Sequence, residues 1–199
     1  ADSGMPRLGF PAEDGGTGDT GGALTSFEML GHLDLSLMVK AGVQWGLFGG
    51  AIANLGNAET RAKYLPGVMS LDLLGCFAMT EVGGGSDVQN LETTATFDPE
   101  TGEFVVTTPT PSAEKAYIGN AARDGRLAAV FAQLITAGPG EEPVSHGVHS
   151  LVVPIRDAAG DDLPGVTTSD CGYKGGLPGV DNGRLRFDQV RVPRTALLN

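Results

Sequence analysis

The chain has 199 residues, of which 41% are hydrophobic, and this is enough apolar material for one substantial core or two small ones. Its formal net charge of −11 argues against nucleic acid or an anionic membrane surface as a partner, because both select clustered lysines and arginines. Two cysteines, Cys76 and Cys171, are too few for a disulfide framework and favour a reducing compartment. No apolar run is expected to reach the roughly 20 residues of a membrane span.

The first part of the chain has helical periodicity. Apolar residues recur at spacings of three and four over residues 24–55, which predicts one helical stripe. We expect the first helix to end at Gly31 and the second to begin at Asp34 or Ser36 and to end near Gly56.

A third, shorter helix is predicted over residues 58–65, with Asn57 as its N-cap and with Pro66 and Gly67 ending it. Trp45 belongs to the apolar stripe, and an aromatic residue at helical spacing is more often part of the core than of a cofactor site.

Beyond Leu71 the pattern changes to short strands. LETTATFD and EFVVTTPT alternate between apolar and polar residues and are joined by a turn over residues 99–102. Further short runs separated by Gly, Pro and Asp predict a compact antiparallel barrel or sandwich. The sequence therefore predicts an α+β fold, with a helical domain over residues 1–72 and a β domain over residues 73–199.

A glycine-rich stretch, CFAMTEVGGGSDV, occupies residues 76–88, at the change from helices to strands. Glycine lets the backbone turn sharply or approach a bound molecule closely, and successive amides there could cradle an anion or a polarised carbonyl. An ordinary glycine-rich connection is the alternative from this stretch alone. A domain boundary is a common place for a ligand cleft, and this favours the functional interpretation.

Other candidate chemistry is weaker. His146 and His149 lie at the start of a predicted strand, where residues three apart point to opposite faces, so no metal site is expected. Ser86 has no base within its motif and no strand-turn-helix elbow, so a serine hydrolase is not indicated.

Five motifs follow one another along the chain: GFPAEDGGTG, GNAETRAKYLP, CFAMTEVGGGSDV, AEKAYIGN and FDQVRVPRTALLN. Together they are similar to the flavin-dependent acyl-CoA dehydrogenase and acyl-CoA oxidase superfamily. HGVHSLVVPIRD and GVDNGRLRFDQVRVPR resemble the oxidase branch. The resemblance implies part of an N-terminal helical domain and a complete middle β domain, in a fragment from which the C-terminal helical bundle is absent.

The resemblance implies FAD as the cofactor, with the Thr80 hydroxyl near the flavin N5 and Ser86 near both the cofactor and the acyl-CoA thioester. A second flavin segment would be Tyr117, Ile118 and Gly119, where Gly119 matches the oxidase pattern and dehydrogenases usually have Ser or Thr. The expected cofactor-binding residues are Phe77, Met79, Thr80, Glu81, Val82, Gly83, Gly85, Ser86, Tyr117, Ile118 and Gly119, of which Ser86 also binds substrate.

The implied reaction is α,β-dehydrogenation of an acyl-CoA thioester to a trans-2-enoyl-CoA. A glutamate removes the Cα proton while a hydride leaves Cβ, and in oxidases dioxygen then takes the electrons. No residue here matches that glutamate, which is expected beyond Asn199, and Glu81 belongs to the flavin motif instead. No catalytic residue is therefore expected within this chain.

Two alternatives stay open: a dehydrogenase that passes electrons to an electron-transfer flavoprotein, and a non-catalytic β-domain module. Asp87 resembles the dehydrogenase version of the loop. The full-length protein is expected to be a homodimer or homotetramer without nucleic-acid or membrane partners, in the cytoplasm or, in a eukaryote, in peroxisomes.

Overall fold

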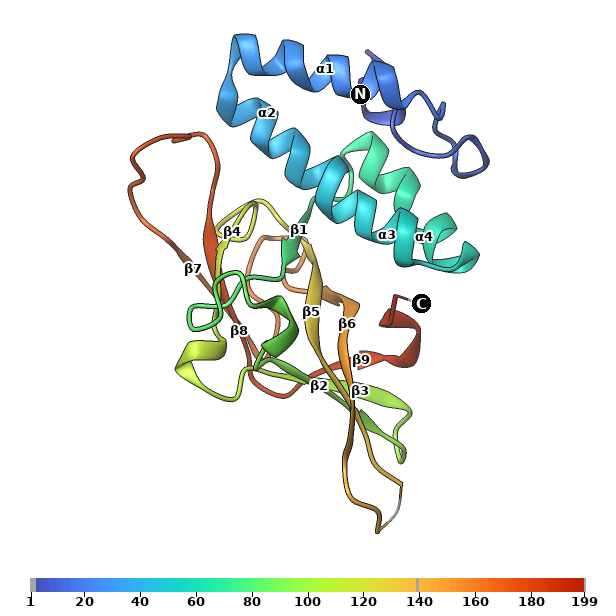
Figure 1. Ribbon diagram of the computed structural model, residues 1–199, viewed down its shortest axis with the longest axis vertical. Coiled ribbons are helices and arrows are strands. Elements are labelled where there is room, and N and C mark those ends of the chain that lie inside the picture. Colours follow the sequence, from blue (N-terminus) through green and yellow to red (C-terminus); the bar gives the residue numbers. More distant parts are fainter. Residues whose placement is uncertain (1–2, 139, 199) are drawn as a thin grey trace.

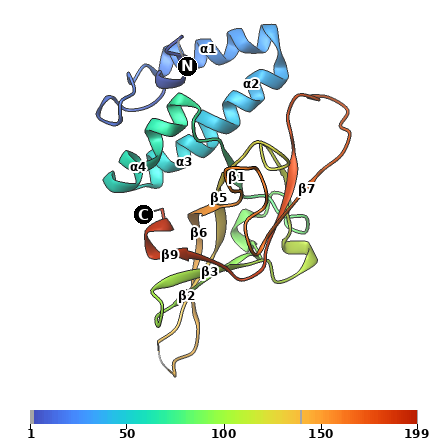
Figure 2. The ribbon, with the colours of Figure 1, turned by 180° about the vertical axis from the view of Figure 1, so that it is seen from behind.

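The computed structural model describes residues 3–138 and 140–198. Helices occupy the N-terminal part and a curled β domain follows, so the expected α+β class is confirmed (Figure 1). The helices form a layer at one end of the β domain, and the view from behind shows the same arrangement (Figure 2). The helical elements are η1 (Met5–Arg7), η2 (Ala12–Asp14), α1 (Thr20–Leu33), α2 (Leu35–Ala41), the π-helical η3 (Gly42–Gly49), α3 (Gly50–Leu55) and α4 (Ala58–Ser70).

Local capping signals place most helix ends correctly. Asp34 caps α2 by accepting a hydrogen bond from the Leu37 amide at 3.0 Å, and Gly56 ends α3. Asn57 caps α4 in the same way. The predicted end of the first helix at Gly31 is wrong, because α1 continues to Leu33.

The predicted end of the third helix at Pro66 is also wrong. Helix α4 runs through this proline to Ser70, where Leu71 adopts a left-handed conformation with φ 68°. Leu65 and Val68 flank the proline and are fully buried, so tertiary packing outweighs the hydrogen bond that proline cannot donate.

The elements α2, η3 and α3 form one helix, Leu35–Leu55, that is long and apolar enough to cross a membrane. This corrects the expectation that no segment reaches that length; Lys40 is the only charged side chain within it. Phe48 and Ile52 are fully buried in a core shared with the β domain. Core helices of water-soluble proteins meet the same criteria, so this is weak evidence for a membrane span.

The β domain consists of two sheets. The larger has the strand order β1-β5-β2-β3-β9 with β6 also paired to β5, and the smaller has the order β4-β8-β7. The strands are β1 (Gly75–Ala78), β2 (Thr94–Asp98), β3 (Glu103–Thr107), β4 (Lys115–Ile118), β5 (Leu127–Thr136), β6 (Val144–Pro154), β7 (Val166–Asp170), β8 (Gly183–Phe187) and β9 (Val190–Pro193). Three 3₁₀ turns complete the domain: η4 (Val88–Asn90), η5 (Pro111–Ala113) and η6 (Arg194–Ala196).

Strand β5 organises the larger sheet. β6 runs antiparallel along one edge, while β1 and β2 both run parallel along the other. β1 covers the first half of that edge, with Ala78 opposite Val130, and β2 covers the second half, with Thr94 opposite Gln133. The expectation of a wholly antiparallel domain is therefore wrong at these two pairings, because the chain leaves the edge of β5 after Ala78 and rejoins it in the same direction.

Two hydrophobic cores hold these layers. One fills the β domain and includes Val106, Val130 and Leu185. The other joins the helices to the sheet and includes Phe48 and Ile52, with Trp45 packed against it as expected. Each fully buried side chain of this size contributes about 1.5–3 kcal/mol relative to an exposed one.

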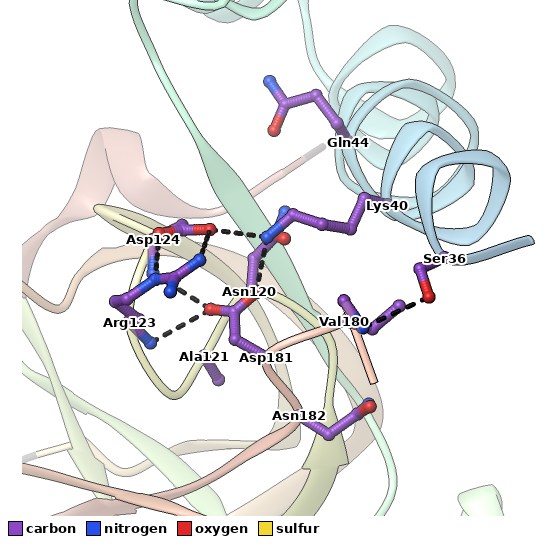
Figure 3. Close-up of polar contacts among 12 residues, drawn as sticks. Ser36, Lys40, Gln44, Asn120, Ala121, Arg123, Asp124, Val180, Asp181 and Asn182 are labelled. Carbon is purple, nitrogen blue, oxygen red and sulfur yellow. Dashed lines mark hydrogen bonds and ion pairs between the residues drawn. The ribbon is translucent and has the colours of Figure 1, made fainter. Parts of the chain in front are cut away.

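A polar cluster also fastens the helical layer to the β domain. The Lys40 Nζ on α2 lies 2.5 Å from Asp124 Oδ2 and 2.6 Å from Asp181 Oδ1 (Figure 3). Asp181 also accepts hydrogen bonds from the amides of Arg123 and Asp124, each at 3.0 Å. The helix is thereby held on the loops that follow β4 and precede β8.

Candidate functional site

The two predicted flavin segments meet in one groove of ≈350 Å³ at the junction of the helical layer and the β domain. One wall comes from the chain after β1, one from the end of β4, and one from the long helix. The lining residues are Val39, Val43, Leu47, Phe77, Met79, Thr80, Tyr117, Ile118, Gly119 and Asn182.

Thr80 follows the end of β1, and its main chain runs beside the start of β4. The Thr80 carbonyl accepts from the Ala116 amide at 3.0 Å, and the Val82 amide donates to the Glu114 carbonyl at 2.9 Å. The Thr80 hydroxyl and the amides of Thr80 and Glu81 have no acceptor within residues 3–138 and 140–198. Unused donors beside a groove are suited to an electron-rich ligand.

The Glu81 side chain is not part of the groove lining, and the residue is only 2% exposed. Its carboxylate accepts from the Glu92 amide at 2.7 Å and from the Thr93 amide and hydroxyl at 3.0 and 2.6 Å. Lys115 Nζ lies 2.9 Å from Glu81 Oε1. The carboxylate is thus fully engaged inside the protein.

The charges of this pair stabilise each other. Burial opposes ionisation of Glu81, but the hydrogen bonds from Thr93 and Glu92 and the Lys115 charge hold its pKa below the usual value. Burial lowers the pKa of Lys115 to about 8 against the attraction of Glu81. Each of the two charges thus favours the charged form of its partner.

Tyr117 stands at the rim of the groove, 71% exposed, in a left-handed conformation with φ 61°. Its carbonyl accepts from Asn182 Nδ2 at 2.9 Å, and β4 has a register shift between Lys115 and Ile118. A bulky residue with positive φ is uncommon and costs about 1–3 kcal/mol, so the fold holds this ring outward at an energetic cost.

Gly119 brings the β domain close to the helix. A Cβ atom at this position would lie 2.7 Å from Val43 Cγ2, so a larger residue needs the helix to move. Val43 and Leu47 belong to η3, and π-helical segments of this kind are frequent at functional sites.

The rest of the glycine-rich loop lies outside the groove. The amides of Val82 and Gly83 donate to the carbonyls of Glu114 and Ser112, so they are not available to cradle a ligand. A Cβ on Gly83 would lie 2.7 Å from the Ser112 Cβ, which gives this glycine a packing role.

Gly85, with φ 52°, and the exposed Ser86 form the outer part of this loop. The structure thus brings together six of the predicted cofactor residues in the groove lining, and Glu81, Val82, Gly83, Gly85 and Ser86 are not part of that lining.

The histidine pair lies elsewhere. His146 and His149 line one groove of ≈380 Å³, which also contains Thr136 and Phe97. Their expected placement on opposite faces is wrong, because Gly147 between them has φ 80° and interrupts the strand alternation. No group of three metal-ligating side chains occurs in the part of the chain that the structure describes.

Sequence reasoning missed four residues that line the groove. Val39, Val43 and Leu47 recur every four residues, so helical periodicity could have placed them on one face. Asn182 comes from a distant loop and has no local signal.

Comparisons with known proteins agree with this arrangement. Residues 1–72 match the acyl-CoA dehydrogenase N-terminal domain, and residues 76–190 match the acyl-CoA dehydrogenase middle domain. The chain is 54% identical over 174 residues to peroxisomal acyl-coenzyme A oxidase 2 of Arabidopsis thaliana, which covers 86% of this chain and 25% of the relative. It is 48% identical over 172 residues to an acyl-coenzyme A oxidase-like protein of Mus musculus, with 86% and 26% covered.

Solved structures give the same result. Acyl-CoA oxidase 1 of Yarrowia lipolytica aligns with a TM-score of 0.84 at 35% identity, over 90% of this chain and 26% of that one. Acyl-CoA oxidase-1 of Caenorhabditis elegans, complexed with FAD and ATP, aligns with a TM-score of 0.78 at 36% identity, over 90% and 26%. The chain spans about a quarter of the length of these relatives. The matched domains, the groove between them and these relatives together show that the chain belongs to the acyl-CoA dehydrogenase family.

Proposed function

We propose that this chain is the FAD-binding portion of an acyl-CoA oxidase, an enzyme that converts an acyl-CoA thioester to its trans-2-enoyl derivative with dioxygen as electron acceptor. The observation that carries the proposal is the meeting of Thr80 with the segment from Tyr117 to Gly119 around one groove. The relatives support the reaction, because those compared above are acyl-CoA oxidases or oxidase-like proteins.

The groove suits a flavin. Its apolar walls, including Ile118 and Val43, can take a flat aromatic ring system, and the Thr80 hydroxyl at its edge has no acceptor within residues 3–138 and 140–198. Tyr117 presents an exposed aromatic ring at the rim, which offers a surface for stacking. Bound FAD would supply the two-electron acceptor that the side chains in the groove cannot provide.

This chain positions the cofactor, and we place the proton-abstracting carboxylate elsewhere in the protein. No aspartate or glutamate lines the groove among the described residues. Glu81 is buried, ion-paired and hydrogen-bonded, so its lone pairs are committed and it does not act as the base.

The assignment to an oxidase rather than a dehydrogenase has one structural support. The Cβ of a serine or threonine at position 119 would lie 2.7 Å from Val43 Cγ2, so these residues would require Val43 or its helix to shift. We propose that the intact protein is a homodimer or homotetramer and that, in a eukaryote, it lies in peroxisomes. A relative from Arabidopsis thaliana is named as peroxisomal.

The test uses the intact protein loaded with FAD and mixed with a long-chain acyl-CoA without oxygen. We expect the flavin absorbance to bleach and hydrogen peroxide to appear when oxygen is admitted. Absence of bleaching refutes acyl-CoA dehydrogenation, and bleaching without peroxide favours transfer to an electron-transfer flavoprotein. A protein that folds but binds no FAD supports the non-catalytic module.

Thr80→Ala examines the groove itself. We expect a shifted flavin spectrum and slower reduction by substrate, because the donor beside the ring is removed. Thr167→Ala, at an exposed position on β7, is the matched control and should leave both unchanged. An unaltered spectrum and rate in Thr80→Ala would count against the role of Thr80.

A further inference from the structure

The edge of β5 has a gap where the glycine-rich segment leaves the sheet. β1 ends opposite Val130 and β2 begins opposite Gln133, so on that edge Phe131 faces no strand from the part of the chain that the structure describes. The ammonium group of Lys115 fills the gap by donating to the Phe131 carbonyl at 2.7 Å. A side chain here takes the place of a missing strand partner.

The same ammonium holds the main chain on both sides of Thr80. It donates to the Met79 carbonyl at 3.0 Å and to the Glu81 carboxylate at 2.9 Å. Its three donors thus have three acceptors, and the side chain is fully buried. The position of Thr80 along the groove is therefore fixed at the residue before it and at the residue after it.

Lys115 also begins the second wall of the groove. Its main chain forms an antiparallel bridge with Glu81, and Tyr117 follows it by two residues. One residue thus connects both segments that line the groove: the first through its side chain, the second through its main chain.

We propose that Lys115 is a positioning residue that sets the distance between Thr80 and the segment from Tyr117 to Gly119, with Glu81 as its counterion. This inference rests on the proposed function, because the ligand whose fit it controls is FAD. A purely structural ion pair would contribute to folding and leave the shape of the groove unchanged.

The experiment separates these roles with a charge-balanced double variant. Lys115→Met alone leaves the buried Glu81 carboxylate without its counterion and is expected to destabilise the protein strongly. Lys115→Met combined with Glu81→Gln removes both charges, so we expect it to recover most of the thermal stability. The double variant still lacks the bond to the Met79 carbonyl.

For the intact double variant we expect FAD binding to weaken about tenfold, equivalent to about 1.4 kcal/mol, with a shifted flavin absorption spectrum. Val106→Ala is the control, because it destabilises the buried core of the β domain away from the groove. It should lower the unfolding temperature and leave the flavin spectrum unchanged.

A double variant that binds FAD as tightly as the wild type, with the same spectrum, overturns the inference and leaves the proposed function intact. A wild-type protein that folds but binds no FAD overturns both. Should the double variant fail to fold, Lys115→Gln combined with Glu81→Gln decides, because glutamine at position 115 is uncharged and has two donors where Lys115 has three. A shifted flavin spectrum in this variant supports the inference, and a wild-type spectrum overturns it.

Discussion

Gly119 should tolerate no side chain while Val43 faces it. An added Cβ lies 2.7 Å from Val43 Cγ2, well inside normal contact distance, and 3.4 Å from Cγ1. Val43 is β-branched, buried and part of a helix, so its side chain has little freedom to rotate away. We therefore expect Gly119→Ala to push the helix away from the β domain.

Overpacking of this kind costs about 1–3 kcal/mol of unfolding free energy. Val43→Ala alone removes two methyl groups at about 0.8 kcal/mol each, giving about 1.6 kcal/mol. The double variant should be more stable than the sum of the two losses by about 1 kcal/mol or more, because the second change relieves the first.

Urea unfolding followed by tryptophan fluorescence measures this cycle directly. Trp45 is the only tryptophan and lies in the same π-helical segment as Val43. Gly84→Ala is the control, since the nearest described atom to a Cβ there lies 3.7 Å away, and it should change stability by less than about 0.5 kcal/mol. Additivity of Gly119→Ala and Val43→Ala within about 0.5 kcal/mol would refute the contact.

Two further predictions concern charge and reactivity. Lys40→Met should cost about 1–3 kcal/mol, between the values for exposed and buried ion pairs, in the same urea assay. The hydrogen bond from Arg123 lowers the pKa of Asp124 to about 2 from 3.8. Partial burial opposes this shift, and Lys40 adds to it. Wild-type stability should therefore fall as pH drops from about 4 to about 2, less steeply in Lys40→Met, and identical pH profiles would contradict this pairing. Burial raises the pKa of the Cys76 thiol to about 12. At pH 8 iodoacetamide should therefore modify Cys171 and leave Cys76 unmodified until the protein unfolds. Equal labelling of the two cysteines, measured by peptide mass spectrometry, would refute the burial of Cys76.

The helical part shows which helix ends can be predicted from local sequence signals. Gly56 and Asn57 were predicted correctly, and Asp34 was one of the two caps offered for the second helix, because a cap depends on a few neighbouring residues. The end of α4 was predicted wrongly, because Leu65 and Val68 are buried by contacts with segments that are distant in the sequence. A proline ends a helix only where tertiary packing does not oppose this, and at Pro66 the packing opposes it.

The groove, too, can be predicted only in part from the sequence. Thr80 and Tyr117 to Gly119 could be identified from the sequence, because the motifs around them resemble a known family. That they meet in one groove depends on β4 running beside the chain after β1, and alternation within a strand does not specify its partner or its direction. The same limit hid the parallel pairing of β1 and β2 with β5.

The sequence by itself determined the order of helices and strands, most helix caps and the motifs of the family. Only the tertiary structure assigned Glu81 to a buried pair with Lys115, 34 residues away, and left the Thr80 hydroxyl without a partner among the described residues. The physical reason is that periodicity and capping depend on neighbours along the chain. The partner of a buried charge depends on which strands pair, and that is decided by the packing of the whole domain.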